Sequence, residues 1–378
     1  MPSASLDMPD RSDTDDYQRL FLQDVPLMDV RAPVEFEQGA FPCATNLPLL
    51  DNDQRHRIGI QYKEYGQDAA IKLGWSLATS EVITHRIEGW RRFVEQHPNG
   101  YLYCFRGGLR SRLSQQLIKE QIGDYPLVTG GYKAMRKYLL EELERVASNQ
   151  SLILISGRTG SGKTIAINQI ARSIDLEGLA KHRGSAFGST DSVQPAQIDF
   201  ENALSVQLLK LRCQNNSPFF LEDEGKLIGK INIPLPLRTA MKKAAHITLT
   251  STIEERIDRV INEYIIENYH RLLKQHSNES AQSHFRCYVL NNLYRIRKRL
   301  GGERYRRVKK SFDNGIELWT TKGISNGFQD GIQTLLTEYY DPMYDYQQKQ
   351  RSQRELFRGN IVEISDWAAN TVHTQSPI

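Results

Sequence analysis

The segment from Cys104 to Ser111, CFRGGLRS, contains the residue types of an anion-binding cysteine loop. It follows a short apolar run, places Arg110 six positions after the cysteine and leads directly into a helical pattern. Backbone N–H groups in such a loop, together with the dipole of the following helix, stabilise negative charge at one point. We therefore expect the thiol of Cys104 to have a lowered pKa and to act as a nucleophile, with Arg110 neutralising a bound oxyanion.

A buried structural cysteine is the ordinary alternative for a free thiol. Two glycines and two arginines in the loop argue against it at Cys104, because an apolar core does not accommodate such residues. Cys43, Cys213 and Cys287 lie in no comparable loop, and we expect them to be structural. The absence of a CxxC spacing also argues against a zinc site and against a disulfide framework.

The residues from Gly157 to Thr164, GRTGSGKT, fit the phosphate-binding pattern G-x-x-x-x-G-K-[ST] in full. They follow a strongly apolar strand pattern and precede a helical one, which is the context that this motif requires. Gly157, Gly160 and Gly162 would let backbone N–H groups turn toward phosphate oxygens, and Lys163 would add a positive charge. The pattern predicts a bound phosphate or diphosphate and leaves open whether it belongs to a nucleotide.

A magnesium ion is the metal that this loop would take. Thr164 would supply a hydroxyl ligand, and Asp223, directly after the strand pattern FFLE, is the candidate carboxylate. Glu222 and Glu224 are alternatives to Asp223, and an ordinary acidic strand end explains the three carboxylates nearly as well.

Positive charge is concentrated between residues 286 and 310, where ten basic residues accompany one acid, Glu303. A solvated helix face is the alternative, but the near-absence of carboxylates favours a polyanionic partner. Tyr288, Tyr294 and Tyr305 are interleaved with the cations and could stack on bases or pack against a core. The residues that we expect to contact a nucleic acid are Arg295, Arg297, Lys298, Arg299, Arg304, Arg306 and Arg307.

Strand and helix patterns alternate along the chain, which predicts an α/β fold with parallel sheets. The expected strands are 26–30, 102–105, 151–156, 218–221 and 246–249, and the expected helices are 111–121, 132–147, 165–174 and 253–267. The length of 378 residues favours two domains. We expect a disordered tail over 1–16, a first domain over 17–147, a P-loop domain over 148–344 that includes the basic segment, and a C-terminal extension over 345–378.

The composition limits where the protein works and what it binds. No apolar stretch approaches the roughly 18 residues of a membrane span, and the acidic first 16 residues do not resemble a signal peptide. We therefore expect a cytoplasmic protein that does not bind a membrane, and we expect a monomer. The formal net charge of +4 alone does not indicate nucleic-acid binding, so that prediction depends on the local concentration of charge.

Several motifs resemble rhodanese domains. They are Asp29-Val-Arg31, Glu35-Phe36, Gly39-Ala-Phe-Pro42 and Ala44-Thr-Asn-Leu-Pro48, together with the Cys104 segment, which resembles the rhodanese active-site loop. The loop is one residue longer than the commonest sulfurtransferase form and matches the C-x5-R length of dual-specificity phosphatases. A loop of this length suits a phosphate-sized anion or selenophosphate.

Three further segments resemble the bacterial tRNA 2-selenouridine synthase family: 175–188, 220–225 and 298–302. The resemblance, which spans about residues 25–310, implies a rhodanese-like domain joined to a P-loop domain. It implies that Cys104 carries selenium, that selenophosphate from selenophosphate synthase is the donor, and that the substrate is the wobble-position 2-thiouridine in the anticodon loop of tRNA. It also implies S-geranylation by geranyl diphosphate as the activating step, with both compounds as co-substrates rather than resident cofactors.

Two other functions remain open. A cysteine phosphatase fused to a small-molecule kinase would satisfy both loops but leaves the basic segment unexplained. A non-catalytic RNA-binding protein would explain the basic segment but has no need of the Cys104 loop.

Overall fold

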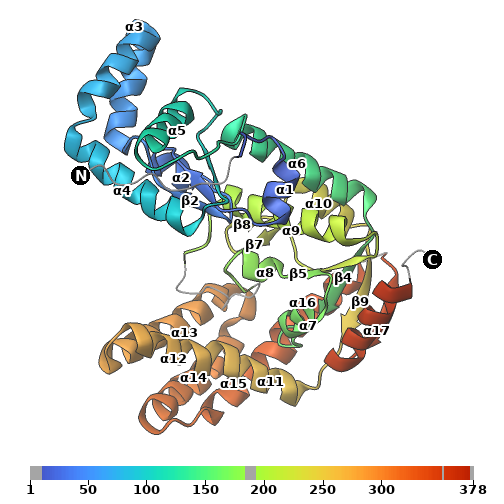
Figure 1. Cartoon of the computed structure of the whole chain (residues 1–378). Coiled ribbons are helices and arrows are strands. Elements are labelled where there is room, and N and C mark those ends of the chain that lie inside the picture. The colour runs from blue at the N-terminus through green and yellow to red at the C-terminus, as the bar shows by residue number, and fades with distance from the viewer. Residues whose placement is uncertain (1–10, 184–192, 351–352, 375–378) are drawn as a thin grey trace. The chain divides into compact units, whose positions relative to one another are not determined.

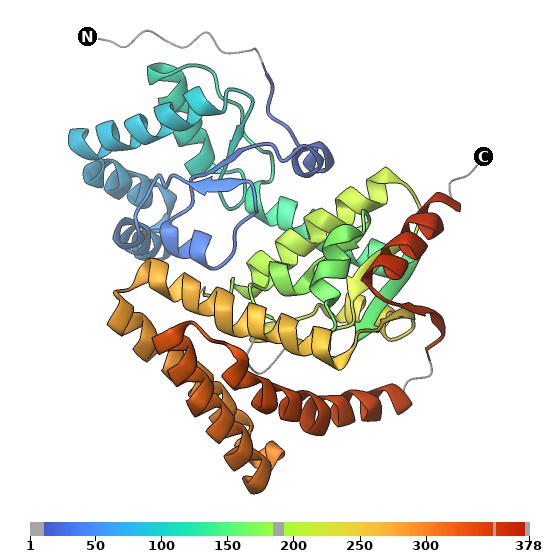
Figure 2. The ribbon, with the colours of Figure 1, turned by 90° about the horizontal axis from the view of Figure 1, so that it is seen from below.

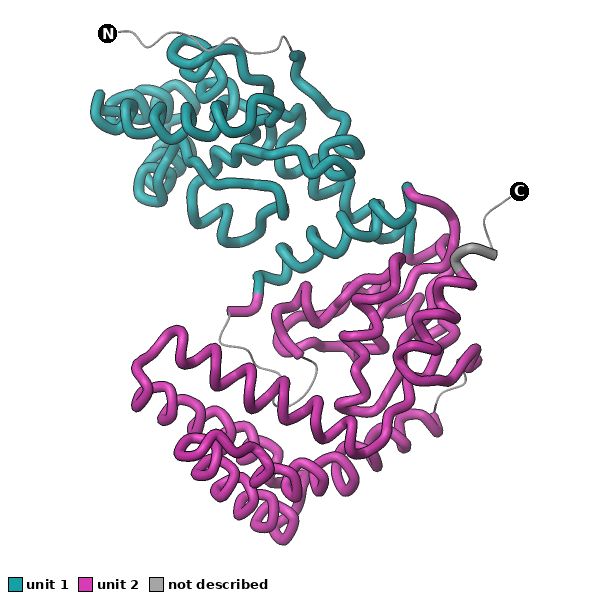
Figure 3. Tube along the Cα trace, turned by 60° about the horizontal axis from the view of Figure 1, so that its bottom comes forward, with its two compact units in different colours: residues 1–146, 195–213 teal, residues 147–194, 214–378 magenta. Residues whose placement is uncertain are grey.

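The computed structural model describes residues 11–183, 193–350 and 353–374 (Figure 1). The chain forms two compact units (Figure 3). Unit 1 comprises Met1–Val146 and Pro195–Cys213, and unit 2 comprises Ala147–Gln194 and Gln214–Ile378. Within the described ranges, no helix has both the length and the apolar character needed to cross a membrane.

Unit 1 is built on a three-stranded parallel sheet. Its strands are β1 (Leu27–Asp29), β2 (Ala44–Asn46) and β3 (Tyr101–Tyr103), in the order β2-β1-β3. The sequence predicted β1 and β3 and missed β2, which is only three residues long and incompletely buried. The helices of this unit are α1 (Tyr17–Leu22), α2 (Pro33–Glu37), α3 (Asn52–Leu77), α4 (Ser80–Gln96), α5 (Leu109–Gln121), α6 (Gly131–Asn149) and α9 (Gln197–Gln214).

Alternate residues of the central strand enter two different cores, as expected for a sheet covered on both faces. Leu27 packs in a cluster with residues of α1, α6 and α9, and Met28 packs in a second cluster with residues of α4 and α5. Sequence reasoning placed residues 195–213 in the P-loop domain, but the structure groups them with unit 1. The reason is that Val206 and Leu209 of α9 are buried in the first cluster, and Asn202 donates to the carbonyl of Ala40 at 2.7 Å.

Part of the expected N-terminal tail is ordered. Arg11 donates to the backbone carbonyls of Pro98 and Gly100 at 2.7 and 2.9 Å, and Thr14 forms a parallel bridge with Val128. Asp13 accepts a hydrogen bond from the backbone of Leu127 at 2.9 Å. Residues 11–16 therefore belong to unit 1, because polar side chains and a short backbone pairing hold them, and residues 1–10 lie outside the described part of the chain.

Unit 2 contains a five-stranded parallel sheet in the order β10-β9-β4-β6-β5. Its strands are β4 (Leu152–Gly157), β5 (Ser173–Ile174), β6 (Phe219–Glu222), β9 (Ala245–Leu249) and β10 (Glu355–Gly359). The shorter elements are α7 (Lys163–Gln169), α8 (Leu176–Leu179), α10 (Leu235–Met241), α17 (Ile361–Thr374) and the antiparallel pair β7 (Leu227–Ile228) and β8 (Ile231–Asn232). The parallel α/β architecture expected from the sequence is thus present in both units.

Two expectations about unit 2 need correction. The expected helix 165–174 ends at Gln169, and β5 follows, because the Arg172 side chain is drawn inward to the backbone carbonyls of Ser217 and Asn215 at 3.0 and 3.2 Å. The expected C-terminal extension is an integral part of the sheet unit. β10 pairs with β9, and Ile364 and Ala368 of α17 are completely buried in the core beside β4.

A helical subdomain between β9 and β10 carries the basic segment (Figure 2). It consists of α11 (Ile253–Ile261), η1 (Asn262–Ile266), α12 (Glu267–Gln275), α13 (Asn278–Leu300), α14 (Gly302–Lys322), η2 (Asn326–Phe328), α15 (Gln329–Leu335), η3 (Leu336–Tyr340) and α16 (Asp341–Lys349). The subdomain has its own core, which includes Phe285, Phe312 and Phe328. Packing of these rings fixes α13 and α14, the two helices that present the cations.

Candidate active site

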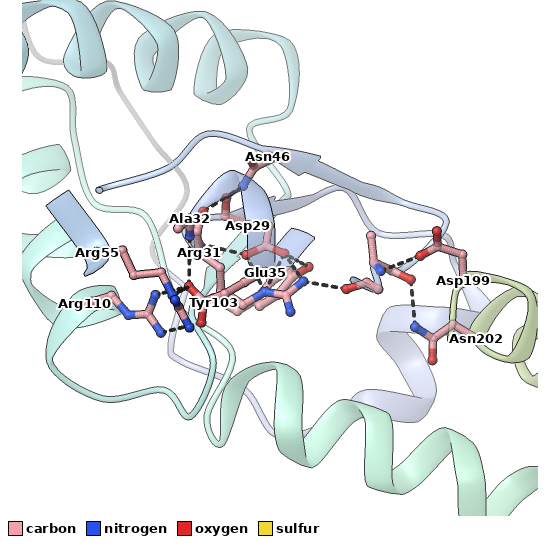
Figure 4. A network of polar contacts seen from close by, with 12 residues as sticks. Asp29, Arg31, Ala32, Glu35, Asn46, Arg55, Tyr103, Arg110, Asp199 and Asn202 are labelled. Atoms are coloured by element: carbon pink, nitrogen blue, oxygen red, sulfur yellow. Dashed lines mark hydrogen bonds and ion pairs between the residues drawn. The ribbon is translucent and has the colours of Figure 1, made fainter. Parts of the chain in front are cut away.

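A buried ion pair fixes the strand ends beside the cysteine loop (Figure 4). Asp29, at the end of β1, accepts from Nε and Nη2 of Arg31 at 2.9 and 2.6 Å and from the hydroxyl of Tyr103 at 2.7 Å. Arg31 also donates to the carbonyl of Gly39 at 2.8 Å and lies over the ring of Tyr132, 3.8 Å from its centroid. Because Tyr103 directly precedes Cys104, this network positions the start of the cysteine loop.

The Cys104 loop connects β3 to α5 and is tied to the beginning of α6. The carbonyl of Cys104 accepts from the backbone of Tyr132 at 2.9 Å, and the carbonyl of Phe105 accepts from Lys133 at the same distance. Gly107 has φ +65°, and a Cβ atom there would lie 2.8 Å from the backbone nitrogen of Gly130. This glycine is therefore required by both the backbone conformation and the close packing of the loop.

The thiol of Cys104 lies inside the loop and is 3% exposed. Its sulfur is 3.2 Å from the hydroxyl oxygen of Ser111. Burial opposes ionisation, but hydrogen bonds with the Ser111 hydroxyl and the backbone N–H groups of Arg106 and Ser111, with the charge of Arg110, hold the pKa of Cys104 below its usual value. By contrast, burial raises the pKa of Cys43 to about 11. Sequence reasoning gave no role to Ser111, whose position at the start of α5 was the available signal.

Arg110 is held by a carboxylate that sequence reasoning did not pair with it. Its Nη1 and Nη2 donate to Glu35 at 2.6 and 3.1 Å, and Arg55 approaches the same carboxylate at 3.1 Å (Figure 4). Burial would raise the pKa of Glu35, but the hydrogen bond and charge of Arg110 lower it overall. An anion that binds Arg110 therefore competes with Glu35 or shares the two arginines with it.

In unit 2 the phosphate-binding loop connects β4 to α7. Gly160 and Gly162 have φ values of +77° and +93°, and a Cβ atom on Gly157 would lie 2.5 Å from the hydroxyl oxygen of Ser161. The ammonium group of Lys163 lies 3.4 Å from the carbonyl of Gly157, across the loop. The structure thus brings these four sequence-predicted residues together around one turn, with α7 starting at Lys163.

The carboxylate that accepts a hydrogen bond from Thr164 belongs to Glu222, one of the two alternatives to Asp223. Thr164 Oγ1 lies 3.4 Å from Glu222 Oε1, whereas Asp223 accepts a hydrogen bond from Ser156. Burial, followed by the charge of Glu177, raises the pKa of Glu222 well above its usual value. A divalent cation would relieve this cost, and hydroxyl and carboxylate oxygens are donors that Mg²⁺ accepts.

This pair alone is no complete metal site. No cluster of three or more His, Cys, Asp or Glu side chains suited to a metal ion occurs among the described residues. Thr164 and Glu222 would therefore hold Mg²⁺ together with the oxygens of a bound phosphate, as is usual for this ion. The ion would offset phosphate charge beside Lys163.

Arginines of α11, which the sequence analysis did not identify, contact the phosphate-binding loop. Arg256 donates to the carbonyl of Thr159 at 2.9 Å and pairs with both carboxylate oxygens of Asp341 at 2.6 and 2.9 Å. Arg259 donates to the carbonyl of Ser161 at 3.1 Å. Because Arg256 and Asp341 are both buried, this pair anchors the loop to the helical subdomain.

The basic segment divides into paired and unpaired cations. Arg304 and Arg307 both pair with Glu338, and Arg286 and Lys309 pair with Asp313. Among the cations of the basic segment, all of which the structure describes, those without an ion pair to a carboxylate are Arg295, Arg297, Lys298, Arg299, Arg306 and Lys310.

The tyrosines of the basic segment differ in their exposure to solvent. Tyr288 and Tyr305 pack against the helical core. Tyr294 is 52% exposed, and the guanidinium of Arg297 lies 3.5 Å from its ring centroid. Tyr294 is thus the exposed tyrosine of this segment, with Arg297 over its ring.

These features define a class of two-unit α/β protein that joins an anion-stabilising cysteine loop to a P-loop domain with a basic helical subdomain. A family model described as the tRNA 2-selenouridine synthase AAA domain matches residues 150–375. The tRNA 2-selenouridine synthase of Marinobacter nauticus is 48% identical over 97% of this chain and 100% of its own length. The synthases of Hahella chejuensis and Photobacterium profundum are 44% and 43% identical, over 98% and 95% of this chain and 97% and 99% of their own lengths.

The chain belongs to the tRNA 2-selenouridine synthase family. Residues 184–188 of the family-like segment 175–188 lie outside the described residues. A solved structure, the N-terminal domain of an ATP/GTP binding protein from Clostridium difficile 630, is 30% identical and covers 31% of this chain and 90% of its own. The TM-score of this match is 0.27.

Proposed function

We propose that this protein is a tRNA 2-selenouridine synthase, a transferase that replaces sulfur by selenium in the wobble-position 2-thiouridine of tRNA. Full-length similarity to relatives of that name supports the reaction. The observation that carries the proposal at the level of chemistry is the Cys104 loop, in which a buried thiol retains a lowered pKa. We propose that it acts in the cytoplasm as a monomer.

Unit 1 is proposed to act as the rhodanese-like domain. Cys104 would carry, as a perselenide, selenium that originates from selenophosphate, which selenophosphate synthase would supply. Because this selenium is at the selenide level, formation of the S–Se bond also requires a two-electron oxidant such as a disulfide, and cleavage of the P–Se bond by water releases phosphate. The lowered pKa of Cys104 keeps more of the side chain as thiolate, the nucleophilic form. Arg110, which pairs with Glu35 beside Arg55, would form an ion pair with the negatively charged phosphate group.

S-geranylation by geranyl diphosphate is proposed as the step that activates the substrate. An alkylated sulfur leaves the pyrimidine more readily than an unmodified thiocarbonyl sulfur does. A selenium nucleophile would then add to C2 of the pyrimidine, and the carbon–sulfur bond would break with release of geranyl thiolate.

Unit 2 is proposed to bind phosphate groups and to position tRNA. Lys163 and the loop N–H groups would hold a phosphate or diphosphate, with Thr164 and Glu222 at the magnesium position. The unpaired cations of α13 and α14 would contact tRNA phosphates, and Tyr294 would stack on a base of the anticodon loop.

Nucleoside analysis tests the reaction directly. tRNA would be isolated from cells grown with selenium, either lacking the gene, complemented with the wild type, or complemented with Cys104→Ala. We expect 2-selenouridine only with the wild-type protein. Equal amounts of 2-selenouridine in all three strains would exclude the proposed function. If the protein were instead a phosphatase fused to a kinase, the three strains would have the same 2-selenouridine content and the purified protein would carry no RNA.

A further inference from the structure

An apolar cavity in unit 1 adjoins the cysteine loop. It has a volume of about 890 Å³ and is enclosed by α3, α4 and α5. Its apolar walls include Leu49, Ile71, Trp75, Ile83 and Leu113. The volume lies within the range of about 300–1,000 Å³ that is usual for small-molecule sites.

The same cavity has a cationic edge. Arg55, Lys63, Arg86 and Arg110 line it, and Glu35 is its one acidic lining residue. Glu35 is shared by Arg55 and Arg110, so the positive charge exceeds what this carboxylate can balance. A ligand that matches both the walls and the edge has an apolar chain and an anionic head group.

The wall of the cavity that α3 forms is partly exposed to solvent. α3 is interrupted at Gly66, where φ is +82° and ψ is −175°. Its two arms form a hairpin, in which a Cβ atom on Gly74 would lie 3.6 Å from Ile58 Cδ1. On this hairpin Ile60 and Trp75 line the cavity yet remain 43% and 51% exposed. Apolar groups left uncovered beside a cavity gain free energy when a ligand covers them.

We propose that this cavity binds geranyl diphosphate, with the isoprenoid chain against the apolar walls and the diphosphate at Lys63, Arg86 and Arg110. The inference rests on the proposed function, because that function supplies the identity of the ligand. It extends the proposed function by assigning the binding site of the alkyl donor to unit 1. The phosphate-binding loop of unit 2 is then left for a different phosphate compound. Arg110 stands at both the cavity and the cysteine loop, so the two co-substrates use neighbouring positions.

Calorimetric titration of the full chain with geranyl diphosphate, without tRNA, tests the assignment. We expect saturable binding, with dimethylallyl diphosphate at least about tenfold weaker because it lacks five carbons that would be buried. Inorganic diphosphate should bind more weakly still.

Matched variants locate the site. Trp75→Ala should weaken binding of geranyl diphosphate at least about fivefold, whereas Tyr65→Ala, which removes a 67% exposed ring of the same hairpin outside the cavity, should not. Lys63→Glu should weaken it similarly, and Lys72→Glu, an exposed position of α3 that does not line the cavity, should not. Circular dichroism checks that each variant folds, and Ile71→Asp provides a second wall variant.

The possible results distinguish a failure of the cavity assignment from a failure of the proposed function. Unchanged binding in the folded Trp75 and Lys63 variants, or binding lost only in Lys163→Ala, would overturn the cavity assignment while leaving 2-selenouridine formation intact. No binding by a wild-type protein that still forms 2-selenouridine would likewise overturn it. No binding together with no modified tRNA would mean that the proposed function itself has failed.

Discussion

Replacing Ser111 by alanine should make Cys104 less reactive. Ser111 is completely buried, and its hydroxyl oxygen accepts from the Cys104 thiol at 3.2 Å while the hydroxyl donates to the carbonyl of Gly108 at 2.9 Å. When the thiol ionises it can no longer donate, and the Ser111 hydroxyl can turn to donate to the thiolate. A hydrogen bond to a charged group contributes about 1.5–3 kcal/mol. Its loss should shift the equilibrium between thiol and thiolate toward the thiol by roughly 10- to 100-fold, because each 1.4 kcal/mol corresponds to about a factor of ten.

The assay is the rate of alkylation by iodoacetamide between pH 5 and 9, followed at each cysteine by peptide mass spectrometry. The pKa of Cys104 is lowered, so its wild-type thiolate should persist to lower pH than an ordinary cysteine, and reactivity should fall as pH drops through the folded pKa. Cys43, whose pKa is raised to about 11, is an internal control that should react slowly throughout.

Ser114→Ala provides the matched control. Ser114 is also completely buried on α5 and donates to a backbone carbonyl, that of Arg110, at 3.0 Å. It should leave the pH profile of Cys104 unchanged. If Ser111→Ala reacts at the wild-type rate over the whole pH range, the hydroxyl does not stabilise the thiolate and this explanation of the lowered pKa is wrong.

Three other substitutions test the remaining sites. Cys104→Ala should abolish 2-selenouridine formation without unfolding the protein, as nucleoside analysis and circular dichroism would show. Lys163→Ala should weaken the binding of a phosphate compound to the loop of unit 2 at least about tenfold in a titration, because the substitution removes the positive charge of that loop. Joint charge reversal at Arg297, Arg299 and Arg306 should weaken tRNA binding strongly and flatten its dependence on salt, since each lost phosphate contact lowers the slope by about 0.7–0.9. Wild-type tRNA affinity in that variant would return the basic segment to a solvated helix face.

The features that could be predicted from the sequence are those encoded within a few neighbouring residues. The phosphate-binding loop is recognisable because glycine spacing determines the turn itself, and the Cys104 loop because cysteine, glycines and arginine follow one another directly. The parallel sheets followed from apolar strand patterns alternating with helical ones.

Features that depend on distant residues were not predictable in the same way. Glu35 and Arg110 are 75 positions apart in the sequence, and Arg256 and Asp341 are 85 positions apart. No local sequence pattern predicts either pair. β10 was missed because an edge strand with charged residues has a weak apolar pattern, and its place beside β9 is defined only by the completed sheet.

The central claim is that Cys104 carries selenium to tRNA. The most direct measurement incubates the purified protein with isotopically labelled selenophosphate, a disulfide as two-electron oxidant, geranyl diphosphate and tRNA that contains 2-thiouridine, and follows the label by mass spectrometry. We predict labelled selenium on the Cys104 peptide before it appears in 2-selenouridine, and neither product with Cys104→Ala. Labelled 2-selenouridine formed at the wild-type rate by Cys104→Ala would contradict the claim.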